Sequence, residues 1–138
     1  MHVEQLDDLT VSLADGYVTL RDAAAALSDA GINIEAVCMI GGGAAAECHV
    51  LVKSAIRATA ALEQRGIVVL DARRVYAMRL PNRPGTLARV LDLLLPQPGA
   101  IDFIYQATDR GLIVGSPDAD QILRTLSPFD ADAMAVSS

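Results

Sequence analysis

Two segments of this 138-residue chain resemble each other, and this internal repeat restricts the possible folds more than any other feature. The first segment is Asp15–Leu20, and the second, Asn82–Leu87, begins 67 positions later. Apolar residues follow each segment at positions i, i+3, i+4 and i+7, the spacing of one face of an amphipathic helix. These positions are Leu20, Ala23, Ala24 and Leu27 in the first copy and Leu87, Val90, Leu91 and Leu94 in the second. The repeat therefore predicts one supersecondary unit that is used twice.

Each copy predicts the element order β-α-β-β-α-β, because alternating apolar stretches and helical stripes follow one another in that order. In the first copy we expect strands within 3–13, 32–40, 46–53 and 67–70 and helices over 19–30 and 54–65, with Thr19 and Ser54 as N-caps. In the second copy we expect strands over 74–80, 100–106, 111–115 and 131–136 and helices over 86–95 and 118–126. The sequence thus predicts an α+β protein of two tandem ferredoxin-like units, residues 1–72 and 73–138, with antiparallel sheets and helices on one face.

The composition excludes several classes of function. Hydrophobic residues make up 52% of the chain, which is typical of a globular protein and not of a disordered one. The formal net charge is −6 and no run of Lys or Arg occurs, so we expect neither nucleic-acid binding nor binding to an anionic membrane. The N-terminus lacks the basic and apolar regions of a signal peptide, and no 18-residue apolar run is present. The sequence therefore predicts a cytoplasmic protein.

Motifs for catalysis or metal binding are missing from the sequence. Because no Cys-x-x-Cys, His-Glu-x-x-His or nucleophile elbow occurs, we expect no metal, no cofactor and no catalytic residue, and we predict that the protein is not an enzyme. Cys38 and Cys48 are expected as packing residues on the inward side of neighbouring strands. His49 is expected on a strand surface, with Glu47 on the same face.

The second copy is similar to the ACT domain family, the small regulatory modules that sense amino acids in metabolic enzymes. The resemblance is carried by the strand that ends at Leu80, by Asn82–Leu87, by the apolar stripe that follows, and by Ile101–Phe103. In the first copy it is carried by Leu20 and by Gly31–Ile34. It covers nearly the whole chain in two copies, and the chain most resembles stand-alone tandem ACT proteins, which have no attached catalytic domain.

The resemblance implies a ligand site where two units meet, with the loop before the first helix of one unit facing the start of the second strand of its partner. It implies one site formed by Asn82, Arg83, Pro84, Gly85, Thr86 and Leu87, with Asn33 and Ile34 opposite. It implies a weaker, pseudo-symmetric site formed by Asp15, Gly16 and Tyr17, with Asp102 and Phe103 opposite. The expected ligand is an amino acid or a related small metabolite.

The residues of the second-copy loop suit such a ligand physically. Gly85 has no Cβ and lets the backbone approach a ligand closely, and the N–H groups and dipole of the following helix favour a carboxylate. Asn82 offers a donor and an acceptor for a polar group. In the first copy, Val18 takes the place of Gly85 and Tyr17 that of Pro84, so that copy is either a structural partner or a different pocket.

We therefore expect a regulatory or sensor protein in which amino-acid binding shifts the packing between units or chains and so regulates a partner such as a metabolic enzyme. We also expect a homodimer, because the face opposite the helices is half apolar; scattered surface residues are the alternative. The apolar residues expected on that face are Val37, Met39, Leu51, Ile104 and Ile113. Three other interpretations stay open: a tight turn without a ligand at 82–85, a ligand-free structural or oligomerisation module, and a small enzyme on the same scaffold.

Overall fold

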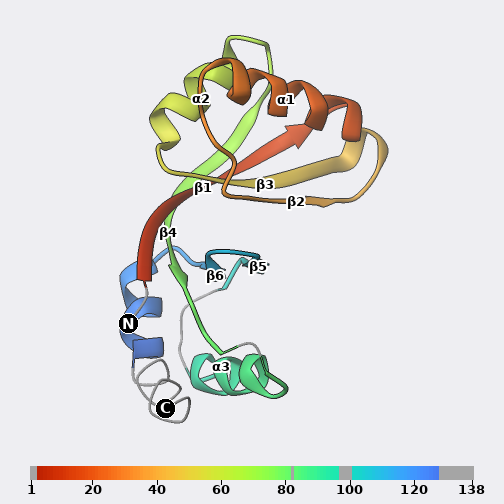
Figure 1. Ribbon diagram of the computed structural model, residues 1–138. Helices are drawn as coiled ribbons and strands as arrows, with labels where there is room; N and C mark the ends of the chain where they lie inside the picture. The colour runs from red at the N-terminus through yellow and green to blue at the C-terminus, as the bar shows by residue number, and fades with distance from the viewer. Residues whose placement is uncertain (1–2, 82, 97–100, 128–138) are drawn as a thin grey trace. The chain divides into compact units, whose positions relative to one another are not determined.

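The computed structural model describes residues 3–81, 83–96 and 101–127. In chain order the elements are β1 (Val3–Leu13), α1 (Tyr17–Asp29), β2 (Ala36–Ile40), the 3-10 turn η1 (Gly43–Ala45), β3 (Ala46–Val52), α2 (Ala55–Glu63), β4 (Val69–Met78), α3 (Thr86–Leu94), β5 (Phe103–Ala107), β6 (Gly111–Gly115) and a helix over 119–127 (Figure 1). The strands form one six-stranded sheet in the order β2-β3-β1-β4-β6-β5. The predicted α+β, ferredoxin-like fold is confirmed; the expected last strand, 131–136, lies outside the described residues.

The chain forms two compact units. The first unit comprises Leu6–Arg74, and the second comprises the described residues among 1–5 and 75–138. Because β1 begins at Val3 and β4 ends at Met78, these two long strands contribute residues to both units. Among the helices of the described residues, none is long and apolar enough to cross a membrane.

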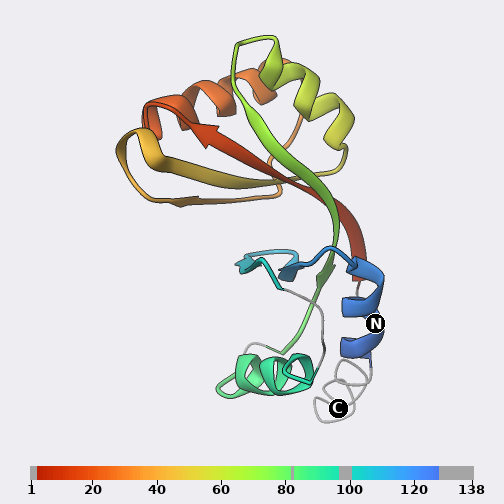
Figure 2. The ribbon, with the colours of Figure 1, turned by 180° about the vertical axis from the view of Figure 1, so that it is seen from behind.

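In the first unit, α1 and α2 cover one face of the sheet formed by β1, β2 and β3 (Figures 1 and 2). β3 pairs antiparallel with both neighbours, placing Val50 opposite Leu9 of β1 and opposite Val37 of β2. Apolar residues at every second position of β1 and β3 point toward the helices, as the period of two along a strand requires. The buried core consists of Leu9, Val11, Leu13, Ala23, Ala26, Leu27, Ala46, Cys48, Val50, Val52, Ala58, Leu62 and Ile67.

The first helix begins earlier than its sequence pattern suggests. The N-cap of α1 is Gly16, so the predicted N-cap, Thr19, is wrong. Thr19 lies in the first turn instead, and its Oγ1 accepts a hydrogen bond from the backbone N–H of Asp15 at 2.9 Å. At the other end, α1 stops at Asp29, and Gly31 takes the left-handed conformation, with φ 72°, that commonly ends a helix.

In the second unit, β6 pairs antiparallel with β4 and with β5, and Met78 lies opposite Leu112. The sheet packs against α3 and the last described helix through a smaller core. This core consists of Met78, Val90, Leu94, Leu112, Val114, Ile122 and Leu126. The start of β1 belongs to this unit as well, because Arg110 Nη1 donates a hydrogen bond to Glu4 Oε1 at 2.6 Å.

The register of β2 corrects the predicted faces of its side chains. Cys38 lies opposite His49, and Met39 lies opposite Cys48. Because directly opposed residues share a face of the sheet, Cys38 and Cys48 lie on opposite faces, and only Cys48 belongs to the core. Val37 and Met39 lie on the helix side of β2 for the same reason, so their predicted positions on the other face are wrong.

None of the five residues predicted to form a half-apolar surface opposite the helices is exposed on that face. Ile104 lies opposite Val114, a core residue, so Ile104 also lies on the helix side. Leu51 and Ile113 do lie on the face opposite the helices, but both are 0% exposed. The homodimer therefore stays a prediction, without the surface from which it was inferred.

Candidate functional site

The loop between β4 and α3 borders a hollow of about 420 Å³ in the second unit. The residues that line the hollow come from this loop and from β5, β6 and their turn. They are Leu80, Pro81, Gln106, Ala107, Thr108, Gly111 and Leu112. None of these residues carries a charge, and Gln106 and Thr108 supply polar side chains. The volume is in the range of small-molecule sites.

Gly85 shapes the start of α3, which begins at Thr86 as the sequence predicted. It is the N-cap and takes a left-handed conformation with φ 91° and ψ −12°. A Cβ at this position would meet nothing within 4 Å, so the backbone conformation, and not crowding by the chain, requires glycine. Arg83, Pro84 and Gly85 are exposed and Thr86 is half-buried, whereas Asn82 lies outside the described residues. The described part of the predicted loop is therefore accessible.

α3 begins without a side-chain cap, and so does α1. The other two helices differ, because side-chain oxygens already occupy their first turns. Ser54 caps α2, and Asp7 Oδ2 accepts a further hydrogen bond there from the N–H of Ala55 at 2.8 Å. In the last described helix, Asp118 Oδ1 accepts from the N–H of Gln121 at 3.0 Å. Internal carboxylates thus bind where an external anion would bind, and of the described α-helices α1 and α3 lack such groups.

The corresponding loop of the first unit is more enclosed. Gly16 is buried with φ 56°, and a Cβ there would lie 3.8 Å from the backbone nitrogen of Gly43. Tyr17 is the first residue of α1 and is 75% exposed, and Asp15 is exposed as well. The glycine is therefore present in both copies, but it lies two positions earlier in the first, where the repeat aligns Val18 with Gly85.

The predicted opposite residues of the main site lie just before β2 and not within it. Asn33 is exposed and Ile34 is half-buried against the first core. Both border an open hollow of about 430 Å³ in the first unit. The other residues that line this hollow are Ala24, Ser28, Gly31 and Ile32.

Asp102 and Phe103, the predicted opposite residues of the weaker site, hydrogen-bond and pack against strands of the second unit. The N–H of Asp102 donates to the carbonyl oxygen of Gly115 at 2.8 Å, while its side chain is exposed. Phe103 stacks on Tyr105 with 5.9 Å between ring centroids. Its ring also covers Gly115, because a Cβ on that glycine would lie 2.1 Å from the ring. Phe103 therefore contributes to packing in the described structure.

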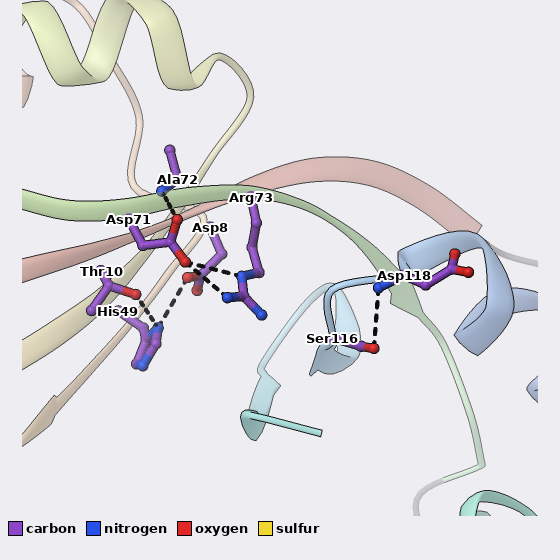
Figure 3. A network of polar contacts seen from close by, with 8 residues as sticks. All are labelled: Asp8, Thr10, His49, Asp71, Ala72, Arg73, Ser116 and Asp118. Atoms are coloured by element: carbon purple, nitrogen blue, oxygen red, sulfur yellow. Dashed lines mark hydrogen bonds and ion pairs between the residues drawn. The ribbon is translucent and has the colours of Figure 1, made fainter. Parts of the chain in front are cut away.

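A buried polar network that the sequence did not reveal lies on the helix-free face of the first unit (Figure 3). His49 Nδ1 lies 2.9 Å from Asp8 Oδ1, and the two residues are 7% and 1% exposed. Thr10 Oγ1 lies 3.4 Å from the same nitrogen, and Arg73 pairs with Asp71 nearby at 2.8 Å. The hydrogen bond to Asp8 raises the pKa of His49 above its ordinary value, although burial opposes the shift. The prediction that His49 lies on a strand surface is wrong.

The sequence carried one signal for this network. Asp8 and Thr10 alternate with the core residues of β1, which places them together on the other face of the strand. Their partner, His49, is 41 positions away from Asp8, and only the pairing of β1 with β3 brings Thr10 opposite His49. A pattern within one strand could indicate a polar face, but it could not indicate burial.

No protein-family model matches this sequence, and no curated protein matches it. Solved structures do share its fold. Protein BT0572 from Bacteroides thetaiotaomicron is 21% identical over 93% of this chain and 89% of that chain, with a TM-score of 0.71. The ligand-free regulatory subunit of aspartate kinase from Thermus thermophilus is 19% identical over 93% of this chain and 97% of that chain, with a TM-score of 0.66. The aspartokinase alpha and beta subunits are 14% identical over 93% of this chain and 96% of that chain, with a TM-score of 0.65.

At these identities the similarity shows the fold alone. It extends along almost the full length of both partners, so the match includes both units of this chain and not one of them. The structural neighbours include regulatory parts of aspartate kinase, and the resemblance to ACT domains is thereby supported at the level of the fold.

Proposed function

We propose that this protein is a regulatory module that binds a free amino acid or a closely related metabolite and catalyses no reaction itself. The observation that carries this proposal is the start of α3, where the left-handed Gly85 leads into a helix without a side-chain cap. The loop that leads to this start borders an uncharged hollow through Leu80 and Pro81. The fold supports the proposal, because it is shared with regulatory subunits of aspartate kinase.

The chemistry of the α3 start suits the two charged groups of an amino acid. The N–H groups of Leu87 and Ala88, in the first turn of α3, have no acceptor within the helix and would donate to the ligand's carboxylate. Gln106 and Thr108 line the hollow, and their side-chain oxygens would accept from the ammonium group. Leu112 would contact an uncharged part of the ligand.

The remaining site residues enter the proposal through the family resemblance. On the loop they are Asn82, Arg83, Pro84 and Thr86, and on the opposite side Asn33 and Ile34. The weaker site would use Asp15, Gly16, Tyr17, Asp102 and Phe103. We further propose that the chain acts as a homodimer and that ligand binding changes its association with a metabolic enzyme.

A thermal-shift screen against the twenty amino acids tests the proposal directly. A ligand that binds only the folded state at 100 times its Kd adds about 2.7 kcal/mol to the free energy of unfolding. At least one amino acid should therefore raise Tm by several degrees. If none of the twenty does so at millimolar concentration, the protein is a ligand-free structural module instead.

The substitution Gly85→Val locates the site. It forces a β-branched residue into a left-handed backbone and fills the approach to the α3 start, so the ligand-induced rise in Tm should disappear. Gly66→Val is the matched control, because Gly66 also has a positive φ of 72° with nothing within 4 Å of its Cβ position but lies at the end of α2. Equal responses of both variants to the ligand would place the site elsewhere.

A further inference from the structure

A second hollow of the second unit differs in charge from the hollow that borders the β4–α3 loop. Its volume is about 270 Å³, and the residues that line it are Val3, Glu4, Ala77, Arg79 and Arg110. They come from the start of β1, from the end of β4 with the residue that follows it, and from the turn between β5 and β6. The two hollows share no lining residue, so the chemistry of this one is separate from that of the proposed amino-acid site.

The backbone of the second unit holds the two arginines of this hollow close together. Gly111, with φ 93°, follows Arg110, and a Cβ on this glycine would lie 2.2 Å from the carbonyl oxygen of Met78. The turn between β5 and β6 therefore lies directly against the end of β4, where Arg79 follows Met78. Arg79 Nη2 donates a hydrogen bond to the carbonyl oxygen of Asp109, the residue before Arg110. This contact places the guanidinium of Arg79 beside the backbone of Arg110.

The charges of the two guanidinium groups are balanced differently. Arg110 Nη1 donates to Glu4 Oε1 at 2.6 Å, so a carboxylate of the chain balances the charge of Arg110. Arg79 forms no ion pair with a carboxylate of the described residues, because its Nη2 contacts the neutral carbonyl oxygen of Asp109. Two basic residues and one acidic residue thus line a hollow in a chain whose formal net charge is −6.

This arrangement suits a small anion with two negative charges. The planar N–H donors of a guanidinium match the oxygens of phosphate and carboxylate groups. The side chains of Arg110 and Glu4 are 28% and 39% exposed, and an ion pair of this kind adds little stability that a ligand would have to replace. A monoanion would gain little over Glu4, whereas a dianion also brings a charge for Arg79. The volume of about 270 Å³ lies just below the range of drug-sized ligands, which favours a small group.

We propose that Arg79 and Arg110 bind a dianion of the phosphate type, and that Glu4 competes with this ligand for Arg110. The ligand is inorganic phosphate or the phosphate group of a small metabolite, and it accepts hydrogen bonds from both guanidinium groups. The contact between Glu4 and Arg110 joins the start of β1 to the turn between β5 and β6. Phosphate that takes the place of Glu4 therefore releases the start of β1 from this turn.

Titration calorimetry of the purified full chain with inorganic phosphate tests the proposal, at about pH 8, above the second pKa of a phosphate group. Chloride at the same ionic strength is the reference. Arg79→Gln should weaken phosphate binding about tenfold or more, because a charge-assisted hydrogen bond is lost. Arg124→Gln is the matched control and should bind as the wild type does, because Arg124 is an exposed arginine of the same unit that lines none of the described hollows. Glycerol phosphate as the titrant distinguishes the two sources, since it binds equally well only if the site accepts the phosphate group of a metabolite.

Glu4→Gln gives a prediction of the opposite sign. The variant removes the carboxylate that competes for Arg110, so it should bind phosphate more tightly than the wild type does. Asp92→Asn is the control for total charge, because it also removes one negative charge from the second unit but lies exposed on α3 and lines none of the described hollows. Equal gains in both variants would show a general effect of net charge, which contradicts a local site.

Two further results would overturn the proposal: no heat beyond that of chloride, or an Arg79→Gln protein that is folded by circular dichroism and binds phosphate as tightly as the wild type. If Arg79→Gln does not fold, Arg110→Gln must weaken binding instead. Hydrogen exchange of the wild type needs no variant, and phosphate should slow exchange in peptides that contain 77–80 and 108–111; slowing confined to other peptides contradicts the site. Gly85→Val should keep phosphate binding, so the outcome here is independent of the proposed amino-acid site.

Discussion

α1 and α3, the first helix of each copy, begin with the same local backbone structure in different surroundings. α1 and α3 both start after a glycine with positive φ, 56° at Gly16 and 91° at Gly85, and neither has a side-chain cap. Gly16 is buried, and the backbone of Gly43 lies 3.8 Å from its Cβ position, whereas the Cβ position of Gly85 has nothing within 4 Å. The same start is thus enclosed by the chain in the first unit and open in the second.

The comparison shows that position along the helix separates the two copies more than residue type does. Relative to the apolar stripe, α1 starts two residues before α3, because Tyr17 corresponds to Pro84 at the repeat offset. The longer helix shortens the preceding loop and brings its start against the η1 turn. One copy can therefore stabilise the fold while the other keeps an accessible helix start, although both have the same element order.

The largest expected effect on stability comes from truncating residues of the apolar stripes of α1 and α3. Leu27 of α1 is 0% exposed in the first core, and Leu91 of α3 is 38% exposed. We expect Leu27→Ala to lower the free energy of unfolding by about 2–5 kcal/mol and Leu91→Ala by less than about 1 kcal/mol, because only the first leaves a cavity. Urea denaturation measures both. Equal losses would mean that the outer side of α3 is packed as tightly as the inner side of α1.

The next largest expected effect is a difference in stability between substitutions of Gly16 and of Gly85. Gly16 combines φ 56° with ψ −132°, a conformation that other residues rarely adopt, whereas Gly85 lies in the ordinary left-handed region. We expect Gly16→Ala to cost about 2 kcal/mol and Gly85→Ala about 1 kcal/mol. Only Gly85→Ala should also reduce the rise in Tm caused by an amino-acid ligand. Thermal denaturation with and without ligand tests both statements, and loss of the ligand response in the Gly16 variant instead would reverse the roles of the two copies.

A smaller effect contrasts capped with uncapped helix starts. We expect Ser54→Ala and Asp118→Ala each to cost about 1 kcal/mol, because each removes an oxygen that accepts from a first-turn N–H group. Thr86→Ala, at the start of α3, should cost less than about 0.5 kcal/mol, since α3 has no side-chain cap. Chemical denaturation of the three variants gives the ranking, and a Thr86 variant as unstable as the other two would show a cap at α3 after all.

The smallest expected effect is a change of stability with pH, and it concerns the first unit. Asp8 and His49 are buried there, whereas Ser116 is the only buried polar residue among those described in the second unit. The hydrogen bond to Asp8 raises the pKa of His49 in the folded state above its ordinary value near 6.5. Protonated His49 thus stabilises the fold fully below about pH 6.5, and this stabilisation is lost as the pH rises through the folded-state pKa. The stability difference between wild type and His49→Gln should therefore shrink as the pH rises above about 6.5. A difference that is constant or grows would contradict the assignment.

The element order and the repeat could be predicted from the sequence because they depend on local patterns. The apolar stripes of α1 and α3, the glycine before α3 and the cap at Ser54 are all visible within a few residues. The start of α1 was predicted too late, because Thr19 resembles an N-cap residue, yet Gly16 supplies the required backbone conformation three residues earlier.

The faces of β2 could not be predicted, because every residue of Ala36–Ile40 is apolar and the strand has no alternating pattern. A shift of one residue in its pairing reverses all of its side chains, and this error placed Cys38 in the core and Val37 outside it. The buried pair of Asp8 and His49 could not be predicted for another reason, since it depends on a contact between residues 41 positions apart.

The division of β1 between the units has a consequence for the order in which the chain folds during synthesis. The first unit is one continuous stretch, Leu6–Arg74, whose contacts can all form soon after Arg74 leaves the ribosome. The second unit must wait, because Glu4 meets Arg110 only after 106 further residues have been made. During synthesis the first unit can thus fold while the apolar residues of the second unit are still exposed to solvent.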